Sequence, residues 1–333
     1  MSDTLSRRPP VRILWGNLSW HPAVAAWRLL DDNGPGPECV EVLREGKKSA
    51  TYRLAGVGPN GSGVIAQRAL AQKAAPERTV YERILPHVPV TAPRYYGVRE
   101  EPRGTGFTWL FFEDVGDDRY SDTDTEHRAL AARWVAQLHT GATRVAAARE
   151  LPEGGPPRYL HYLRASRELL GTLSNPALAA EDVATLCELV ADLRRLERRW
   201  SWLETACAGV PATVVHGDLQ RKNTYIRHGP AGPELYAIDW ETAGWGVPAA
   251  DLTRIDLSTY WAAVRPAWPA VQFEHVRRLA AVGRVLLQLV AIHWVSPELC
   301  YDSPLYLRRP MSWVRAYHER LAEAVRRLEE ETA

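Results

Sequence analysis

One stretch that ends at Asn223 constrains this chain more than any other part of its sequence. It begins with an apolar run, typical of a buried strand, and then supplies His216, Asp218 and Asn223. A second apolar run follows at short range and ends at Asp239. Residues 227–233, between the two runs, are rich in glycine and proline and predict a turn. We therefore expect the two runs to pair as a hairpin that brings Asp218, Asn223 and Asp239 together.

These residue types suit phosphoryl transfer from a nucleotide. Such a reaction needs a carboxylate that orients the attacking hydroxyl and receives its proton. It also needs two oxygen-bearing side chains that hold magnesium against the phosphates. Asp218, Asn223 and Asp239 could supply these groups.

Two motifs stand in order here, His216-x-Asp218-x-x-x-x-Asn223 and Ile238-Asp239-Trp240-Glu241. Together they resemble the aminoglycoside phosphotransferase and choline kinase-like family, which consists of small-molecule kinases with the protein-kinase fold. Residues 246–252 resemble the block that follows in this family. A chance turn that carries Asp and Asn explains one motif, but not three blocks in family order and spacing.

The resemblance implies a role for each of these residues. Asp218 is implied to be the catalytic base, and Asn223 and Asp239 are implied to bind Mg²⁺. His216 is implied to be structural, and Asp251 to brace the catalytic loop. The implied cofactors are ATP or GTP together with Mg²⁺.

The fold implied by the resemblance is an α+β, bilobal protein-kinase-like fold. It has a small N-terminal lobe with an antiparallel sheet and a larger, mostly helical C-terminal lobe. We expect the nucleotide-binding lobe over residues 1–114, including an extra segment 1–37 that packs against it. The lobe with the catalytic hairpin and the acceptor site is expected over residues 115–333. A chain of 333 residues, 46% apolar and 24% charged, is ample and ordinary for such a fold.

Composition argues against several classes of function. The net charge of +1 gives no electrostatic case for binding nucleic acid or a membrane. The four cysteines lie far apart and are interpreted as reduced thiols of a cytoplasmic protein. There is no run of about 18 apolar residues, so no transmembrane helix is expected. Arg7-Arg8 is not followed by the apolar region of a signal peptide. The oligomeric state is left open.

Two strands are expected over residues 39–54, and in the family this hairpin covers the nucleotide phosphates. The turn between them contains Gly46, Lys47, Lys48 and Ser49. Lys47 and Lys48 are expected either to reach phosphate oxygens or to be solvated turn charges. A P-loop is rejected, because Glu41 occupies the position where that motif requires glycine.

The next strand, residues 63–68, departs from the family. Relatives carry a lysine here that binds the α- and β-phosphates and pairs with a glutamate of the next helix. Glu77 matches that glutamate, but the lysine position falls on Gln67 or Arg68. Arg68 would keep the charge, whereas Gln67 fits the local resemblance, and strand alternation lets only one of them face the site. If neither serves, Lys73 or a loop lysine is the alternative.

The purine is expected to bind the backbone of the family's hinge, around Glu113 to Val115. The candidates for acceptor contact follow or lie within the catalytic blocks: Glu241, Arg221, Asp256, Tyr260, Trp261 and Arg265. After Asp251 the chain has nearly equal numbers of basic and acidic residues, so it shows no acidic patch for a polycationic aminoglycoside. Its aromatics and arginines favour a neutral or anionic acceptor with a flat or sugar-like part, although core packing also explains aromatics at helical spacing.

Helices are expected over residues 20–30, 77–85, 160–173, 176–200, 252–264, 271–296 and 310–331. Thr123 and Glu126 suggest a capping box in front of a further helix that ends near His139. Asn175 is the expected N-cap of the helix that starts at Pro176. His139 is expected to be a core or cap residue.

The leading hypothesis is an ATP- or GTP-dependent O-phosphotransferase that modifies an antibiotic or a related sugar- or nucleoside-like natural product. Only four lysines occur against many arginines, which suggests the GC-rich genome of an antibiotic producer. One alternative is a housekeeping kinase for choline, homoserine or a sugar. Another is a nucleotide-binding pseudokinase, which the missing strand lysine favours and the intact Asp218, Asn223 and Asp239 disfavour.

Overall fold

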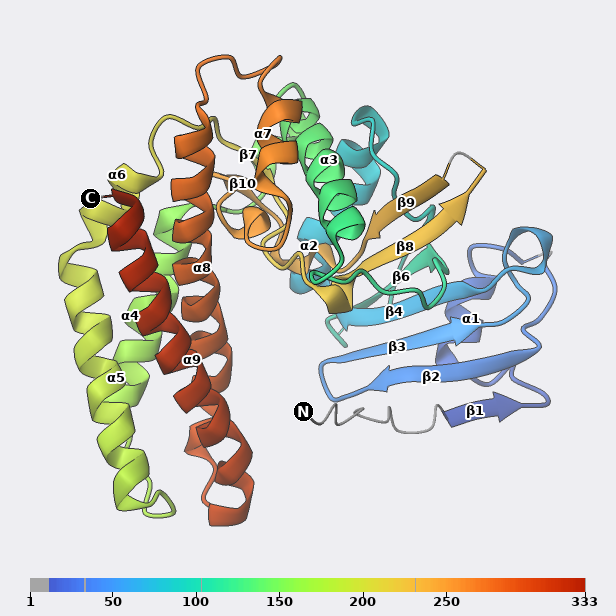
Figure 1. Ribbon diagram of the computed structural model, residues 1–333. Coiled ribbons are helices and arrows are strands. Elements are labelled where there is room, and N and C mark those ends of the chain that lie inside the picture. The colour runs from blue at the N-terminus through green and yellow to red at the C-terminus, as the bar shows by residue number, and fades with distance from the viewer. Residues whose placement is uncertain (1–11, 33, 103, 231, 333) are drawn as a thin grey trace. The chain divides into compact units, whose positions relative to one another are not determined.

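The computed structural model describes residues 12–32, 34–102, 104–230 and 232–332 (Figure 1). The chain divides into two compact units. The first comprises the chain up to Pro86, Thr91–Tyr120 and Asn223–Glu241, and the second comprises His87–Val90, Ser121–Lys222 and the chain from Thr242. Of the extra segment expected at 1–37, residues 1–11 and 33 lie outside the described residues. The predicted division into a nucleotide lobe and an acceptor lobe is a statement about function and stays a prediction.

The first unit is built on a six-stranded antiparallel sheet with the order β1-β2-β3-β4-β6-β5. Its strands are β1 (Arg12–Trp15), β2 (Cys39–Glu45), β3 (Ser49–Leu54), β4 (Val64–Leu70), β5 (Tyr95–Glu100) and β6 (Phe107–Glu113). A two-stranded hairpin, β8 (Thr224–Gly229) and β9 (Gly232–Ala237), also belongs to this unit.

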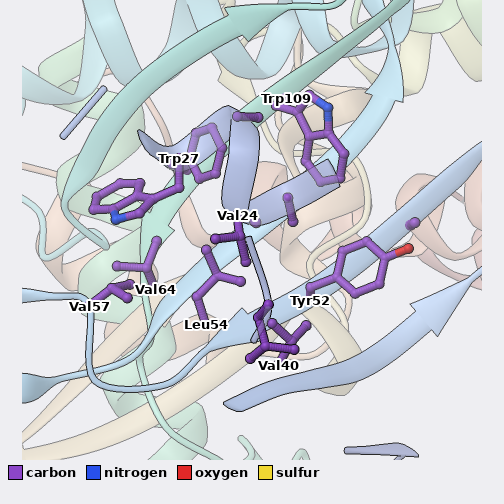
Figure 2. Packing of buried hydrophobic residues seen from close by; sticks show 14 residues of the cluster. Val24, Trp27, Val40, Tyr52, Leu54, Val57, Val64 and Trp109 are labelled. Atoms are coloured by element: carbon purple, nitrogen blue, oxygen red, sulfur yellow. The ribbon is translucent and has the colours of Figure 1, made fainter. Parts of the chain in front are cut away.

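Helix α1 (Pro22–Arg28) covers one face of the six-stranded sheet. Its Val24 and Trp27 lie in one buried cluster with Leu54 of β3 and Val64 of β4 (Figure 2). The described part of the extra N-terminal segment therefore packs on the small sheet, as predicted.

Helix α2 (Ala71–Thr79) contacts β4 through the other face of that strand. Ala66 of β4 joins the α1 cluster, whereas the neighbouring Gln67 bonds to Glu77 of α2. The helix begins at Ala71, earlier than predicted, and continues as a π-helical turn (Val80–Ile84). Its buried residues recur at helical spacing from Ala74 through Glu77 to Val80, which explains the longer helix.

The second unit is mostly helical. Its helices are α3 (Thr125–Ala142), α4 (Pro156–Thr172), α5 (Ala180–Arg198), α6 (Trp200–Ala206), α7 (Leu257–Val264), α8 (Phe273–Val295) and α9 (Pro304–Thr332). Strands β7 (Thr213–Val215) and β10 (Gly244–Gly246) pair with each other. Helix α8 packs against α4 and α9 and contributes many of the unit's buried apolar residues.

Within the described residues, one segment, Phe273–Cys300, is long and apolar enough to cross a membrane by length and composition alone. However, 61% of its most apolar window is buried inside the protein. Core helices of globular proteins pass the same test. Packing against α4 and α9 accounts for the apolar side chains of this segment.

Two predicted helix caps are wrong. Asp124, rather than Thr123, caps α3, because its Oδ1 accepts the N–H groups of Glu126 and His127 at 2.8 and 3.1 Å. Asn175 does not cap α5, which starts at Ala180. Its side-chain amide instead donates to the Leu299 carbonyl at 2.7 Å.

Two helices of the C-terminal part also differ from the prediction. Helix α9 begins at Pro304 and includes Pro310, which was expected to start it. An internal proline removes one backbone hydrogen bond, and here Pro310 is buried beside Met311 and Leu307. Helix α7 begins only after Asp256, whose carboxylate caps it.

Gly283 of α8 lies in close contact with the backbone that precedes α7. A Cβ atom at Gly283 would lie 1.9 Å from the Ala249 carbonyl oxygen. We expect Gly283→Ala to lower the free energy of unfolding by about 1–3 kcal/mol, the usual cost of overpacking. The matched control is Gly171→Ala in α4, whose Cβ would make an ordinary 3.8 Å contact with Val190. Denaturant unfolding checks both variants, and equal stability would contradict the prediction.

Candidate active site

A buried carboxylate holds the loop that follows β7. Asp251 accepts the N–H of His216 at 2.7 Å and the N–H of Gly217 at 2.9 Å. Gly217 has a φ of +79°, in the left-handed region that favours glycine. An added Cβ there would lie 3.0 Å from the Thr242 carbonyl oxygen. The path of the loop is thus set by one acceptor and one glycine.

A histidine and a tyrosine extend this buried network. His139 is fully enclosed, with Nε2 3.3 Å from Asp251 Oδ2 and Nδ1 2.9 Å from the Tyr260 hydroxyl. Burial opposes ionisation of Asp251, but the hydrogen bonds from His139 and from the His216 amide keep its pKa below the ordinary value. His139 is a core residue, as predicted.

Asp218 follows this anchored loop in the second unit. Its Oδ2 lies 2.7 Å from Lys222 Nζ, and Gln220 donates its side-chain amide to Oδ1. The Asp218 N–H donates to His216 Nδ1 at 3.3 Å. The sequence interpretation missed Lys222 and Gln220, although both lie inside the motif.

The strand pairing around this motif differs from the prediction. Strand β7, in front of His216, pairs with β10 and not with the strand in front of Asp239. The hairpin is formed instead by β8, which starts directly after Asn223, and β9. The structure thus places Asn223 and Asp239 in the first unit and Asp218 in the second. That all three act on one phosphate stays a prediction.

Asn223 and Asp239 border the open end of the hairpin. The Asn223 carbonyl accepts the Ile238 N–H at 2.9 Å, one step beyond the last ladder pair. Asp239 has a φ of +66°, which is uncommon for residues other than glycine and is often found at functional sites. Within the described chain, no cluster of three or more His, Cys, Asp or Glu could hold a metal. An amide and a carboxylate oxygen still fit Mg²⁺, which usually takes one or two protein ligands and completes its shell with phosphates and water.

Glu77 of α2 is a second buried carboxylate, with 1% of its surface exposed. Its oxygens accept the Gln67 side-chain amide at 3.1 Å and the Trp240 N–H at 3.2 Å. Burial, reinforced by the negative charge of Asp239, raises the pKa of Glu77 to about 8. This one side chain links β4, α2 and the segment after the hairpin within the first unit.

The choice between Gln67 and Arg68 is settled by strand alternation. Gln67 faces Glu77, whereas Arg68 points to the opposite face of β4. There its Nη2 lies 2.8 Å from Glu101 Oε2, and its guanidinium carbon lies 3.6 Å from the ring centre of Phe107. The predicted pairing of Arg68 with Glu77 is wrong.

A family model described as "Phosphotransferase enzyme family" matches residues 40–284. The chain belongs to this phosphotransferase family. The resemblance inferred from the motifs is confirmed, and so is the class of enzyme, a phosphotransferase with a hydroxyl acceptor. A comparison with curated proteins gives no match.

Several solved structures share the fold of this phosphotransferase. The microcompartment-associated aminopropanol kinase has a TM-score of 0.59 and 16% identity, with 92% of this chain and 98% of that chain covered. The GDP and kanamycin complex of APH(2")-IIia has a TM-score of 0.57 and 16% identity, with 92% and 97% covered. The spectinomycin phosphotransferase APH(9)-Ia, in complex with ADP and spectinomycin, has a TM-score of 0.55 and 9% identity, with 86% and 93% covered. The predicted α+β, protein-kinase-like fold is confirmed.

The predicted nucleotide loop of the phosphotransferase is a tight turn between β2 and β3. The Gly46 N–H donates to the Ser49 carbonyl at 3.0 Å and closes the turn. Lys47 and Lys48 are exposed at its tip. At this position the two lysines could reach phosphate oxygens or could be solvated turn charges, and both interpretations stay open.

The predicted hinge follows β6. The Glu113 N–H donates to the Arg94 carbonyl at 2.8 Å, and the Asp114 N–H donates to the Gly63 carbonyl at 3.3 Å. Val115 is buried and packs in a cluster that contains Tyr225. The amides of residues 113 and 114 thus have backbone partners, and the contact of a purine with this segment stays a prediction.

Four of the predicted acceptor contacts lie at α7, where they have structural partners. The Asp256 carboxylate caps the helix, and the Trp261 indole N–H donates to the Val271 carbonyl at 3.0 Å. The Arg265 guanidinium lies 5.4 Å from the ring centre of Trp261. Only 1% of Tyr260 is exposed, so the prediction that it touches the acceptor is wrong. No local pattern shows that this ring is turned into the core.

The other two predicted acceptor contacts are more accessible. Arg221 is exposed in the second unit, and Glu241 lies in the first unit with its carboxylate 3.9 Å from Lys73 Nζ. The sequence interpretation missed Arg158 of α4, which donates to the Thr242 carbonyl at 2.6 Å. This bond holds the start of the segment that leads from Glu241 to β10.

The raised pKa of Glu77 predicts how the stability of the nucleotide-free protein depends on pH. In the unfolded chain the pKa is about 4.5, and in the folded chain it is about 8. The contribution of Glu77 to stability is therefore fully present below pH 4.5, falls as the pH rises, and is lost at about pH 8. The total change is on the order of 5 kcal/mol, since one pKa unit corresponds to about 1.4 kcal/mol.

We expect Glu77→Gln to remove this part of the pH dependence, because glutamine keeps the shape and the acceptor oxygen but does not titrate. Denaturant unfolding in EDTA between pH 5.5 and 8.5 measures the difference in slope from the wild type. Glu82→Gln, at an exposed carboxylate that bonds to Arg78, is the matched control and should keep the wild-type slope. Identical slopes for the wild type and Glu77→Gln would rule out the protonated carboxyl.

Proposed function

We propose that this phosphotransferase moves the γ-phosphate of ATP or GTP to a hydroxyl group of a small molecule, with Asp218 as the base. The observation that carries the proposal is the bracing of the Asp218 loop by Asp251, whose carboxylate accepts two backbone N–H groups. General-base catalysis requires a carboxylate held at hydrogen-bond distance from the acceptor hydroxyl, and an anchored loop meets that requirement.

In the proposed reaction, Asp218 accepts a hydrogen bond from the acceptor hydroxyl and takes its proton as the oxygen attacks the γ-phosphorus. The bond from that phosphorus to the bridging oxygen breaks, and the nucleoside diphosphate leaves. Asn223 and Asp239 are the proposed ligands of Mg²⁺, which supplies positive charge at the phosphates when bound. Lys222, 2.7 Å from Asp218, holds the carboxylate in position before the acceptor arrives.

The nucleotide is proposed to bind in the first unit, with its purine at the backbone of Val115. Two structural neighbours support nucleotide binding, since one is a complex with GDP and the other a complex with ADP. Both ATP and GTP are therefore kept as phosphate donors. We propose a cytoplasmic location, where both nucleotides are available.

For the acceptor we propose an antibiotic or a related sugar- or nucleoside-like natural product. Neighbours bound to kanamycin and spectinomycin support a hydroxyl-bearing antibiotic. The second unit also exposes large aromatic side chains, including Trp294 at 50% and Tyr301 at 55%. Tyr301 lies 4.6 Å from Tyr306, ring centre to ring centre. Aromatic faces of this kind suit a flat or sugar-like acceptor. The nearly equal numbers of basic and acidic residues after Asp251 give no acidic patch for a polycation.

A small-metabolite kinase is the second candidate. The aminopropanol kinase is as similar to this chain in fold as the kanamycin-bound enzyme, with TM-scores of 0.59 and 0.57. The fold therefore does not discriminate between the two acceptors. A nucleotide-binding pseudokinase is the non-enzymatic alternative, because Gln67 occupies the position where relatives carry lysine.

A panel of acceptors tests the proposal and separates these candidates. It contains aminoglycosides, nucleoside antibiotics and small amino alcohols, each with ATP and with GTP. We expect phosphoryl transfer to at least one antibiotic by the wild type, measured as nucleoside diphosphate release and as phosphorylated product.

Asp218→Asn should lower the rate of transfer by roughly 10²–10⁴ while nucleotide affinity is kept, because only the base is removed. Wild-type rates in Asp218→Asn would refute its role, and nucleotide binding without transfer would favour the pseudokinase.

The two proposed metal ligands predict a specific change in magnesium dependence. We expect Asp239→Ala to abolish most of the activity, and Asn223→Ala to raise the Mg²⁺ concentration needed for half-maximal rate, since each removes one oxygen ligand. The matched control is Asp117→Ala, at an exposed carboxylate of the first unit. Titration of the rate with Mg²⁺ is the measurement. An unchanged Mg²⁺ requirement in both variants would contradict the pairing.

A further inference from the structure

The first unit is proposed to bind the nucleotide, and it must then present a positive charge to the phosphates. Strand β4 does not supply that charge. Gln67, which faces Glu77, is neutral, and Arg68 is held by Glu101 on the other face of the strand. A nucleoside triphosphate with one magnesium ion still carries net negative charge. The cation that binds it must therefore come from another element.

Lys73 of α2 lies one helical turn before Glu77. Ala74, Glu77 and Val80 form the buried stripe of this helix, and Lys73 borders that stripe, partly exposed. Its ammonium nitrogen lies 3.9 Å from the Glu241 carboxylate. Glu241 follows the proposed metal ligand Asp239 by two residues, so Lys73 sits beside the segment that carries this ligand. All of these residues belong to the first unit.

The ion pair of Lys73 with Glu241 is one that a ligand can replace. The two side chains are 41% and 38% exposed, and solvent-exposed pairs at such distances contribute little to stability. A lysine also carries a point charge on a flexible four-carbon stem, which lets the ammonium turn toward a phosphate. A phosphate is the stronger partner because it offers several charged oxygens.

We propose that Lys73, and not a residue of β4, supplies the ammonium group that binds the nucleotide phosphates. This inference rests on the proposed function of the site. It implies that the positive charge has moved from the strand to the first turn of the following helix, while Gln67 keeps the hydrogen bond to Glu77. Lys47 and Lys48, at the exposed tip of the β2–β3 turn, are the competing cations and form an arm of the test.

The test compares affinities for a triphosphate and for the matching nucleoside. ATP and GTP analogues with Mg²⁺, and adenosine and guanosine alone, are titrated by calorimetry into the wild type and Lys73→Met. Methionine keeps the aliphatic stem and removes the charge. We expect the triphosphate to bind about 10–150-fold more weakly, the usual worth of hydrogen bonds to charged groups, and the nucleoside to bind unchanged. Arg78→Met, which removes a charge from the exposed face of the same helix, is the matched control and should bind both like the wild type.

A relocation variant then distinguishes a charge from a merely structural role. In Lys73→Met combined with Gln67→Lys, the cation returns to the strand beside Glu77, and we expect most of the triphosphate affinity to return. Wild-type affinity in Lys73→Met, or loss of affinity only in Lys47→Ala and Lys48→Ala, would overturn the inference and leave the proposed function standing. Failure of the wild type to bind either triphosphate would overturn both.

Discussion

The buried Glu77 carboxyl group is the contact that ties three segments of the first unit together. It joins β4 through Gln67 and the end of the hairpin through the Trp240 amide, and it does so from α2. Burial and the nearby charge of Asp239 oppose ionisation of this carboxyl group, and the cation of β4 faces away. The proton is therefore kept to about pH 8. Because Trp240 directly follows Asp239, the position of the proposed metal ligand is tied to this neutral contact.

The second unit also contains a buried carboxyl group, but this one is ionised rather than protonated. Asp251 is as deeply buried as Glu77, but it accepts two backbone N–H groups and lies against His139, and its pKa is lowered. The difference shows that the donors around a buried acid decide its charge, and burial alone does not. An ionised Asp251 fixes the loop of Asp218, whereas Glu77 holds Gln67 and the Trp240 amide in its protonated form.

A phosphate site constrains where positive charge lies in space, and less so which element carries it. In this phosphotransferase the strand position holds Gln67, which donates a hydrogen bond to Glu77. The chain has just four lysines, and one of them lies a single helical turn from Glu77. On this view the missing strand lysine does not by itself indicate a pseudokinase, because the charge and the hydrogen bond can be supplied by two residues.

The sequence by itself determined the family and the kinase-like fold, because these depend on local motifs and their order. It named Asp218, Asn223 and Asp239 as candidates, but it predicted the wrong strand pairing around them. It also predicted the extra helix at the N-terminus, since Val24 and Trp27 show a helical apolar face. Only the tertiary structure decided between Gln67 and Arg68. A shift of one residue exchanges the faces of a strand, and the register of β4 is set by β3 and β6 on either side of it. The same holds for Asn175 and Tyr260, whose partners Leu299 and His139 lie more than a hundred residues away in the chain, where no local pattern can indicate them.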